Sequence, residues 1–214
     1  RMVVPGTVFN FTRSGNETFT DPMGDTVTVP PNVPAYTEYG LSMAAGSGSR
    51  CWFSELVSDA VWNPWNVDQG GFQCEIYLLG ALSEDRVLAY YYSNADNWAK
   101  LFYDNASGKI KFSITRETVT TTITALAAAV TATLYQVGVY WTGTNLENDH
   151  VAHTMALYID RVLQATGTAA GAIVDIVPTL DLGSALGSDI LRGCIRKIVA
   201  YQHVPTPLEM TRSI

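Results

Sequence analysis

Charged residues are scarce in this sequence, and positive ones are the scarcer. Only 15% of the 214 residues are charged, and 13 lysines and arginines stand against 20 aspartates and glutamates, a net charge of −7. Lysine and arginine form no cluster along the chain. Binding to a phosphate backbone requires such a basic patch, so we expect no nucleic acid as a partner.

Long apolar runs are also missing. No stretch approaches the ~20 apolar residues that a membrane-spanning helix needs, so we expect no membrane partner. The first residues lack the charged-then-apolar pattern of a secretory signal peptide. The sequence begins with Arg1 rather than methionine, which is consistent with a trimmed or partial chain.

Cysteine is rare and unpatterned. The chain has Cys51, Cys74 and Cys194, an odd number without C-x-x-C spacing. This argues against a disulfide framework and against a structural zinc site. We interpret the three as reduced structural thiols of a chain folded inside a cell.

Alternating apolar residues, in contrast, recur along most of the chain. Residues 71–78 place Phe72, Cys74, Ile76 and Leu78 on one face of a predicted strand. Residues 98–114 form two such segments around a predicted turn from Asp104 to Gly108. Strands at roughly ten-residue spacing predict an all-β, antiparallel β-sandwich.

Two regions depart from this pattern. Residues 120–136 are rich in alanine and threonine and leave helix and strand both open. Near the start, Pro30, Pro31 and Pro34 cannot stand inside a central strand. We therefore divide the chain into an extended N-terminal arm with the first strands, residues 1–45, and a sandwich, residues 46–214. We expect residues 1–40 to pair with the sheet edge of a neighbouring molecule or to lie across a protein shell.

The second half of the chain carries a series of short motifs in a recognisable order. They are Val137–Trp141, Leu157–Arg161, Leu182–Gly183, Gly193–Tyr201 and Thr206–Glu209. In this order they resemble the concanavalin A-like, laminin-G-like jelly-roll domains. The resemblance implies a jelly-roll sandwich.

Asp160 is the one acid inside these motifs whose role is open. We interpret it as a hairpin residue whose carboxylate caps backbone N–H groups, with a metal or substrate ligand as the alternative. The resembled domains have glycine after this aspartate, because a tight hairpin favours positive φ there. Arg161 follows here, so we expect a wider turn or one of another type.

Residues 9–40 resemble the opening of bacteriophage virion proteins that carry a jelly roll. The shared positions are Phe11–Ser14, Thr18–Phe19, Asp21, Gly24 and Asn32–Pro34, whereas Ala35 replaces the expected arginine. Together the resemblances imply a non-enzymatic structural or adhesion protein of a virion, a capsid decoration or a tail component assembled in the host cytoplasm. Its expected partners are other virion proteins and further copies of itself, for example in a trimer.

Catalytic patterns are missing from the sequence. A retaining glycosidase needs two carboxylates about 5 Å apart, and the E-x-D-x-x-E pattern that would supply them is absent. Glu84 and Asp85 are adjacent, and we expect them in a turn. Arg50 and Glu55 do not reproduce the R-x-E-L motif of polysaccharide lyases. We predict no enzyme; a polysaccharide-cleaving enzyme is the least favoured alternative.

Metal binding has weak support only. His150 and His153 would diverge on a strand, so we interpret them as solvent-facing. Calcium is the best cofactor candidate, because several relatives of the resembled domains bind it. Asn145, Glu147 and Asp149 lie in an oxygen-rich loop and are its weak candidate ligands. The favoured interpretation is a polar loop without an ion.

Two stretches combine aromatic side chains with asparagine and aspartate, the composition of a sugar-binding site. Such sites stack a sugar ring on an exposed Trp or Tyr and bond its hydroxyl groups with amides and carboxylates. The candidate glycan-binding residues are Trp62, Trp65, Asp68, Tyr92, Asn94, Asp96, Asn97 and Trp98. The favoured interpretation is that these aromatic residues fill the core or a subunit interface, with the glycan site as the alternative. A carbohydrate-binding module is thus the second function that the sequence supports.

Overall fold

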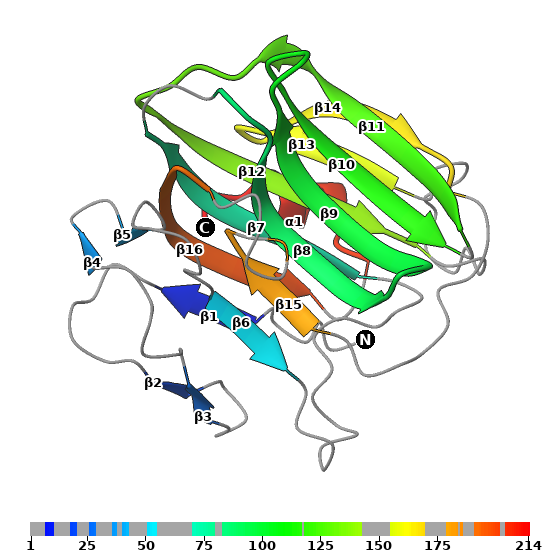
Figure 1. The fold of residues 1–214 in the computed structure, drawn as a ribbon. Coiled ribbons are helices and arrows are strands. Elements are labelled where there is room, and N and C mark those ends of the chain that lie inside the picture. Colours follow the sequence, from blue (N-terminus) through cyan, green and yellow to red (C-terminus); the bar gives the residue numbers. More distant parts are fainter. Residues whose placement is uncertain are drawn as a thin grey trace.

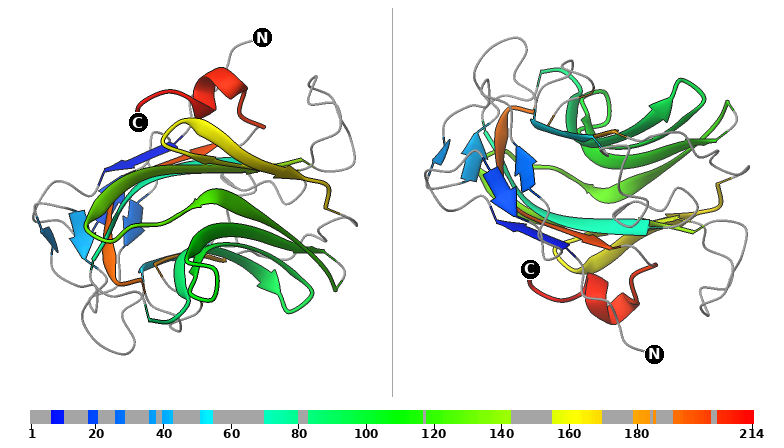
Figure 2. Two further views of the ribbon diagram at one scale, coloured as in Figure 1. Left: turned by 90° about the horizontal axis from the view of Figure 1, so that it is seen from above. Right: turned by 90° about the horizontal axis from the view of Figure 1, so that it is seen from below.

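Two antiparallel β-sheets pack face to face in the computed structural model of the chain (Figures 1 and 2). The structure describes residues 7–10, 18–20, 26–28, 36–37, 40–42, 51–54, 70–79, 83–116, 118–142, 155–169, 179–183, 185, 191–201 and 204–214. Within these residues one sheet has eight strands and the other has six. They are called the larger and the smaller sheet below.

The larger sheet has the strand order β14-β13-β12-β7-β16-β5-β4, and β1 also pairs with β16. Its strands are β1 (Thr7–Asn10), β4 (Tyr36–Thr37), β5 (Gly40–Ser42), β7 (Gly70–Leu78), β12 (Thr133–Trp141), β13 (Met155–Ile159), β14 (Val162–Gly167) and β16 (Gly193–Tyr201). Thus β1 and β5, which belong to the first 45 residues, pair with β16 of their own chain.

The smaller sheet has the order β11-β10-β9-β8-β15-β6. Its strands are β6 (Cys51–Ser54), β8 (Arg86–Asn94), β9 (Asn97–Asp104), β10 (Lys109–Arg116), β11 (Val119–Ala128) and β15 (Thr179–Leu182). A separate hairpin joins β2 (Thr18–Thr20) to β3 (Thr26–Thr28), and α1 (Pro207–Met210) lies near the C-terminus. No helix in the described part of the chain is long and apolar enough to cross a membrane.

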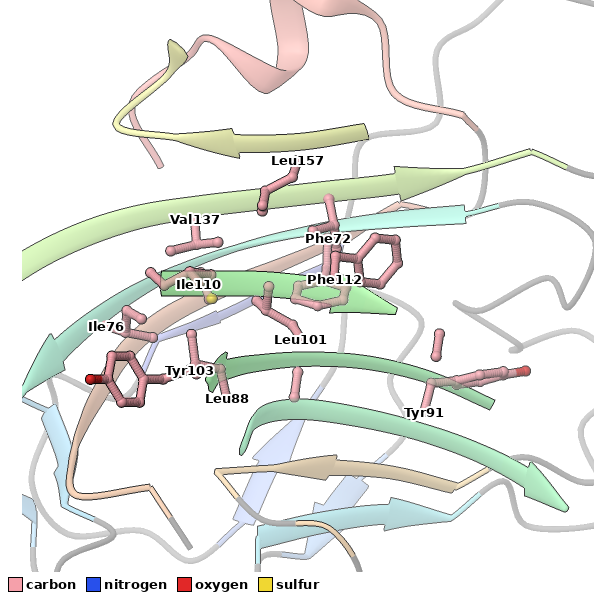
Figure 3. Close-up of a cluster of buried hydrophobic side chains, with 14 of the residues drawn as sticks. Phe72, Ile76, Leu88, Tyr91, Leu101, Tyr103, Ile110, Phe112, Val137 and Leu157 are labelled. Carbon is pink, nitrogen blue, oxygen red and sulfur yellow. The ribbon is translucent and has the colours of Figure 1, made fainter. Parts of the chain in front are cut away.

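The core lies between the two sheets (Figure 3). Residues of alternate positions enter it from each strand, as the period-two pattern predicts; Ile76 of β7, Phe112 of β10 and Val137 of β12 are completely buried. Trp141 is also completely buried, and its ring lies about 6 Å from that of Phe112. The predicted all-β antiparallel sandwich is confirmed.

The turn between β9 and β10 lies where the sequence predicts it. Asp104 lies opposite Lys109 in the strand register. The backbone N–H of Gly108 donates to the Asp104 carbonyl at 2.9 Å, and Gly108 has a φ of 68°. The alanine-rich stretch that left helix and strand open forms the strand β11 along Val119–Ala128. Pairing with β10 explains this outcome, because Ile123 opposite Phe112 enters the core.

The hairpin between β13 and β14 confirms the interpretation of Asp160 and corrects that of its turn. Ile159 pairs with Val162, so the turn has two residues, and both have positive φ: 49° at Asp160 and 68° at Arg161. This is the tight turn that glycine usually enables, and the expected wider turn is wrong. The Asp160 carboxylate accepts from the Gln136 backbone N–H at 2.9 Å, while the Asp160 N–H donates to the Gln136 carbonyl. These bonds hold the turn closed without glycine.

Candidate functional site

The outer surface of β8 and β9 carries a row of aromatic side chains. Tyr91 and Leu101 point into the core, so the residues next to them in each strand point outward. The outward residues are Tyr90, Tyr92, Trp98, Lys100 and Phe102, and we call their surface the aromatic face. The first four are partly exposed.

The register between the two strands brings these rings together. Tyr92 lies directly opposite Trp98, and Tyr90 lies opposite Lys100. The centroid of the Tyr90 ring is 5.6 Å from that of Tyr92 and 6.1 Å from that of Trp98. The three rings therefore form one continuous surface, held by cross-strand and same-strand contacts.

Lys100 lies between Trp98 and Phe102 on β9, opposite Tyr90. Its Nζ is 4.5 Å from the centroid of the Phe102 ring and 5.7 Å from that of Trp98. Phe102 is only 8% exposed. The lysine therefore covers an outward phenylalanine and places its ammonium group among the rings by cation–π attraction.

Two hydroxyl pairs continue the face on β10 and β11. Ser113 Oγ lies 2.7 Å from Thr122 Oγ1, and Thr115 Oγ1 lies 2.7 Å from Thr120 Oγ1. Ser113 is opposite Lys100 in the register, so the first pair extends the row that contains the lysine. Hydroxyl groups both donate and accept hydrogen bonds.

Asp104 ends β9 on this face and is fully engaged. Its Oδ2 lies 2.8 Å from Lys111 Nζ and accepts from the backbone N–H of Ser107 at 2.9 Å. The hydrogen bonds from Lys111 and Ser107 lower the pKa of the Asp104 carboxyl to about 2. It is a charged, paired carboxylate at neutral pH and is unsuited to act as a general acid.

The asparagines of the β8–β9 turn support the backbone. Asn94 Oδ1 accepts from the Asp96 N–H at 2.9 Å and from Asn97 Nδ2 at 3.0 Å. Asn97 is 5% exposed, whereas Asp96 is exposed at the tip. Of the five predicted residues in this stretch, Tyr92 and Trp98 lie on the aromatic face, Asn94 and Asn97 shape its end, and Asp96 borders it.

Other sequence candidates lie outside the described residues. These are the glycan candidates Trp62, Trp65 and Asp68, the calcium candidates Asn145, Glu147 and Asp149, and also Arg50, Glu55, His150 and His153. Within the residues that the structure describes, no group of three or more His, Cys, Asp or Glu side chains could hold a metal ion.

Glu84 and Asp85, before β8, have structural partners, and the thiol of Cys74 is buried. Glu84 pairs with Arg86 at 2.8 Å, and Asp85 accepts from the Asn105 N–H at 2.8 Å. Cys74 is buried and forms no disulfide, and burial raises the pKa of its thiol to about 12. Such a thiol is unreactive, as expected of a structural cysteine.

Tyr90, Lys100 and Phe102 belong to the face but were not among the sequence candidates. The signal that could have found them is the two-residue alternation through residues 90–92 and 98–102. This alternation places Tyr90 on the same side of its strand as Tyr92, and Lys100 and Phe102 on the same side as Trp98.

No family model matches the sequence, and a search of curated proteins found no significant match. Solved structures do match. The Ruminococcus gnavus IT-sialidase carbohydrate-binding module CBM40, bound to α2,3-sialyllactose, has a TM-score of 0.59 at 16% identity, over 78% of this chain and 93% of that one.

Two further matches cover almost the whole of this chain. Domain 4 of AbnA, an extracellular GH43 arabinanase of Geobacillus stearothermophilus in complex with arabinotriose, has a TM-score of 0.60 at 12% identity, over 97% of this chain and 96% of that one. Trypanosoma rangeli sialidase has a TM-score of 0.68 at 13% identity, over 96% of this chain but 31% of that one. At such identities the likeness establishes the fold alone, and the chain has the fold of lectin-like, jelly-roll β-sandwich domains.

Proposed function

We propose that this protein is a non-enzymatic carbohydrate-binding module and that it binds glycans on the aromatic face. The observation that carries the proposal is the set of partly exposed, touching rings of Tyr90, Tyr92 and Trp98 on the outside of the sandwich. Outward aromatic rings gathered in one place are a feature of binding surfaces rather than of a solvated sheet face. The apolar face of a pyranose ring can stack on such a surface.

The polar groups around the rings suit the remainder of a sugar. Thr120 and Thr122, the exposed hydrogen-bond partners of the buried Thr115 and Ser113, line the edge strand β11, and Asp96 is exposed at one end. Each hydroxyl group of a sugar both donates and accepts hydrogen bonds, and hydroxyl side chains match that capacity. The asparagines contribute by fixing the turn rather than by contact with the ligand.

The fold is compatible with this function without deciding it. Two of the similar structures, the CBM40 module and domain 4 of AbnA, hold oligosaccharides. Function resides in the site rather than in the fold, so the aromatic face itself is what must be tested.

A glycan array probed with the full chain, followed by calorimetry on the best ligand, tests the proposal. Trp98→Ala should weaken binding at least about fivefold, by analogy with the stacking of a nucleic-acid base on an aromatic ring, which contributes about 1–3 kcal/mol. Leu208→Ala is the matched control, because Leu208 is an exposed apolar residue on α1, which packs on the other sheet. A blank array for the folded wild-type chain, or equal binding by Trp98→Ala, would contradict the proposal.

We propose further that the chain cleaves no glycan and needs no cofactor. Among the described residues of the face, Asp104 is tied to Lys111 and Ser107, so it is not available as an acid. The release of reducing ends from any bound glycan would contradict the first statement. For calcium, we expect equal melting temperatures with added Ca²⁺ and with EDTA; stabilisation by Ca²⁺ would instead support the loop containing Asn145, Glu147 and Asp149.

A virion role is a second proposal, and its support is the resemblance of residues 9–40 to phage virion proteins. In it the sandwich adheres to a capsid or tail and assembles with copies of itself. Since β1 already pairs with β16, the proposal assigns any arm contact with a neighbour to residues other than Thr7–Asn10. A trimer or another symmetric oligomer in native mass spectrometry of the full chain would support it, and a monomer would count against it.

A further inference from the structure

Lys100 is the charged residue at the centre of the aromatic face. We infer that the face takes an anionic glycan, with a carboxylate or sulfate group bound by Lys100. This inference rests on the proposed glycan-binding function and adds the chemical class of the ligand.

The first support is that the charge of Lys100 is not neutralised within the described part of the chain. Two cations near the same face have acidic partners: Lys111 pairs with Asp104, and Arg86 pairs with Glu84, each at 2.8 Å. Among the described residues, Lys100 forms no ion pair, and its ammonium group lies against the rings of Trp98 and Phe102. Its charge therefore remains for a ligand on the candidate binding surface.

The second support is the way the ammonium group is held. The Nζ atom lies 4.5 Å from the Phe102 ring centroid. This contact does not neutralise the ammonium charge, and its three N–H groups can still donate hydrogen bonds. Stacking restricts the flexible side chain before any ligand arrives, so less conformational entropy is lost on binding. A partly exposed, preorganised ammonium group is suited to accept a carboxylate or sulfate.

The surroundings favour an anion as well. Asp104, on the same strand, is occupied by Lys111 and Ser107, and Lys109 lies opposite it in the register. Two lysines thus flank Asp104, which reduces the repulsion of this carboxylate for an anionic ligand.

The spacing fits a ring with a charged substituent. Trp98 and Lys100 are two residues apart on one strand, about 7 Å along it, and Tyr90 lies opposite Lys100. A pyranose ring stacked on Trp98 and Tyr90 would carry a carboxylate or sulfate ester to the ammonium group. Ser113, opposite Lys100 on the other side, is buried and bonded to Thr122, whose exposed hydroxyl can bond the same glycan.

Matched pairs of glycans test the inference. The probes are lactose, 3′-sialyllactose and 3′-sulfolactose, and trigalacturonate with its methyl ester, so that each anionic sugar has a neutral counterpart and carboxylate is distinguished from sulfate. Binding of the full chain is measured by calorimetry at low and high salt. We expect at least one anionic probe to bind about tenfold tighter than its neutral counterpart, since hydrogen bonds to charged groups contribute about 1.5–3 kcal/mol.

Variants assign the preference to the residue. Lys100→Gln should remove the preference for the anionic probe and leave the neutral one within about twofold, and Lys100→Arg should retain the preference. Lys197→Gln is the matched control, because Lys197 is a partly exposed lysine on β16 of the larger sheet. Circular dichroism confirms that each variant is folded.

The outcomes distinguish a failure of the Lys100 role from a failure of the glycan-binding function. Equal affinity for the anionic and neutral probes, or a preference that survives in Lys100→Gln, overturns the role of Lys100 and leaves the glycan-binding function standing. Equal weakening of both probes by Lys100→Gln also overturns it, since the lysine would then act through packing. Binding of no glycan, on the array or by calorimetry, overturns the proposed function itself.

Discussion

The two outer faces of the sandwich are both rich in tyrosine, yet the chain treats them differently. On the larger sheet the C-terminal segment, residues 204–214, packs over the outward side chains (Figure 2). The buried cluster beneath and within this cover consists of Tyr140, Ala156, Tyr158, Val204 and Met210. On the smaller sheet no described element lies over the aromatic face, and the rings of Tyr90, Tyr92 and Trp98 stay partly exposed.

The covered face is built for close contact. Gly138 lies where a Cβ atom would come within 2.6 Å of Met210 Cε. Gln73 is completely buried; its Nε2 donates to the Glu209 carbonyl, and its Oε1 accepts from the Tyr201 hydroxyl. Thr206 and Glu209 form a capping box that begins α1. Space for the cover and polar groups bonded to it indicate a structural role. The aromatic face has no such cover among the described residues, which is why we assign binding there.

The strongest test of this difference is Met210→Ala. Met210 is 1% exposed, and truncation of a buried methionine costs about 2–4 kcal/mol of the free energy of unfolding. Chemical denaturation measures this loss, and glycan binding by the folded variant should be unchanged. A loss of less than about 0.5 kcal/mol would show that the cover contributes little, and the two faces would then be alike.

The covered tyrosines add a prediction at alkaline pH. Burial raises the pKa of Tyr140 to about 12, and that of Tyr201 likewise, from an ordinary value of 10. A raised pKa in the folded state means that the stabilisation is complete below pH 10 and declines as the pH rises toward 12. Denaturation curves across this range should shift to lower denaturant, and Tyr140→Phe should reduce the shift. An unchanged midpoint would contradict the burial of this hydroxyl.

Trp98→Ala should do the reverse of Met210→Ala. Trp98 is partly exposed and contacts Tyr90 and Tyr92 across the strand pair. Its loss should therefore cost roughly 1 kcal/mol of the free energy of unfolding. The same variant should lose glycan binding. Thermal and chemical denaturation measure the first effect; a loss as large as that of Met210→Ala would mean that the aromatic face serves the fold.

Much of the fold could be predicted from local pattern, because strand periodicity decides which residues enter the core. Phe72, Ile76 and Leu78 alternate in sequence and are buried as expected. The cover of the larger sheet could not be predicted, since Gln73 and Glu209 meet across 136 residues. The tight turn at Arg161 also depends on a distant partner, as its guanidinium donates to Ser213 Oγ at 3.2 Å.

The candidate site was predicted in part, for a related reason. Tyr92 and Trp98 follow from composition within one short stretch, because a hairpin brings neighbours in sequence together. Lys100 could not be assigned to the site from the sequence alone, because its place beside Tyr90 depends on the register between β8 and β9. Asparagine is read from sequence as a ligand for sugars, but Asn94 and Asn97 bond each other, since a two-residue turn needs its own polar partners.

The smallest expected effect concerns the ion pair on the open face. The pKa of Asp104 is lowered to about 2 by Lys111 and Ser107. A lowered pKa in the folded state gives stability that is present above about pH 4 and is lost as the pH falls toward 2. Asp104→Asn should cost only about 0.5 kcal/mol at neutral pH, since ion pairs at a surface contribute little. Denaturation midpoints of the wild type and the variant should therefore converge between pH 4 and 2.

A difference between the two midpoints that persists at pH 2 would mean that the asparagine destabilises the fold for another reason. A cost of several kcal/mol at neutral pH would mean that this end of the aromatic face is as essential to the fold as the covered one.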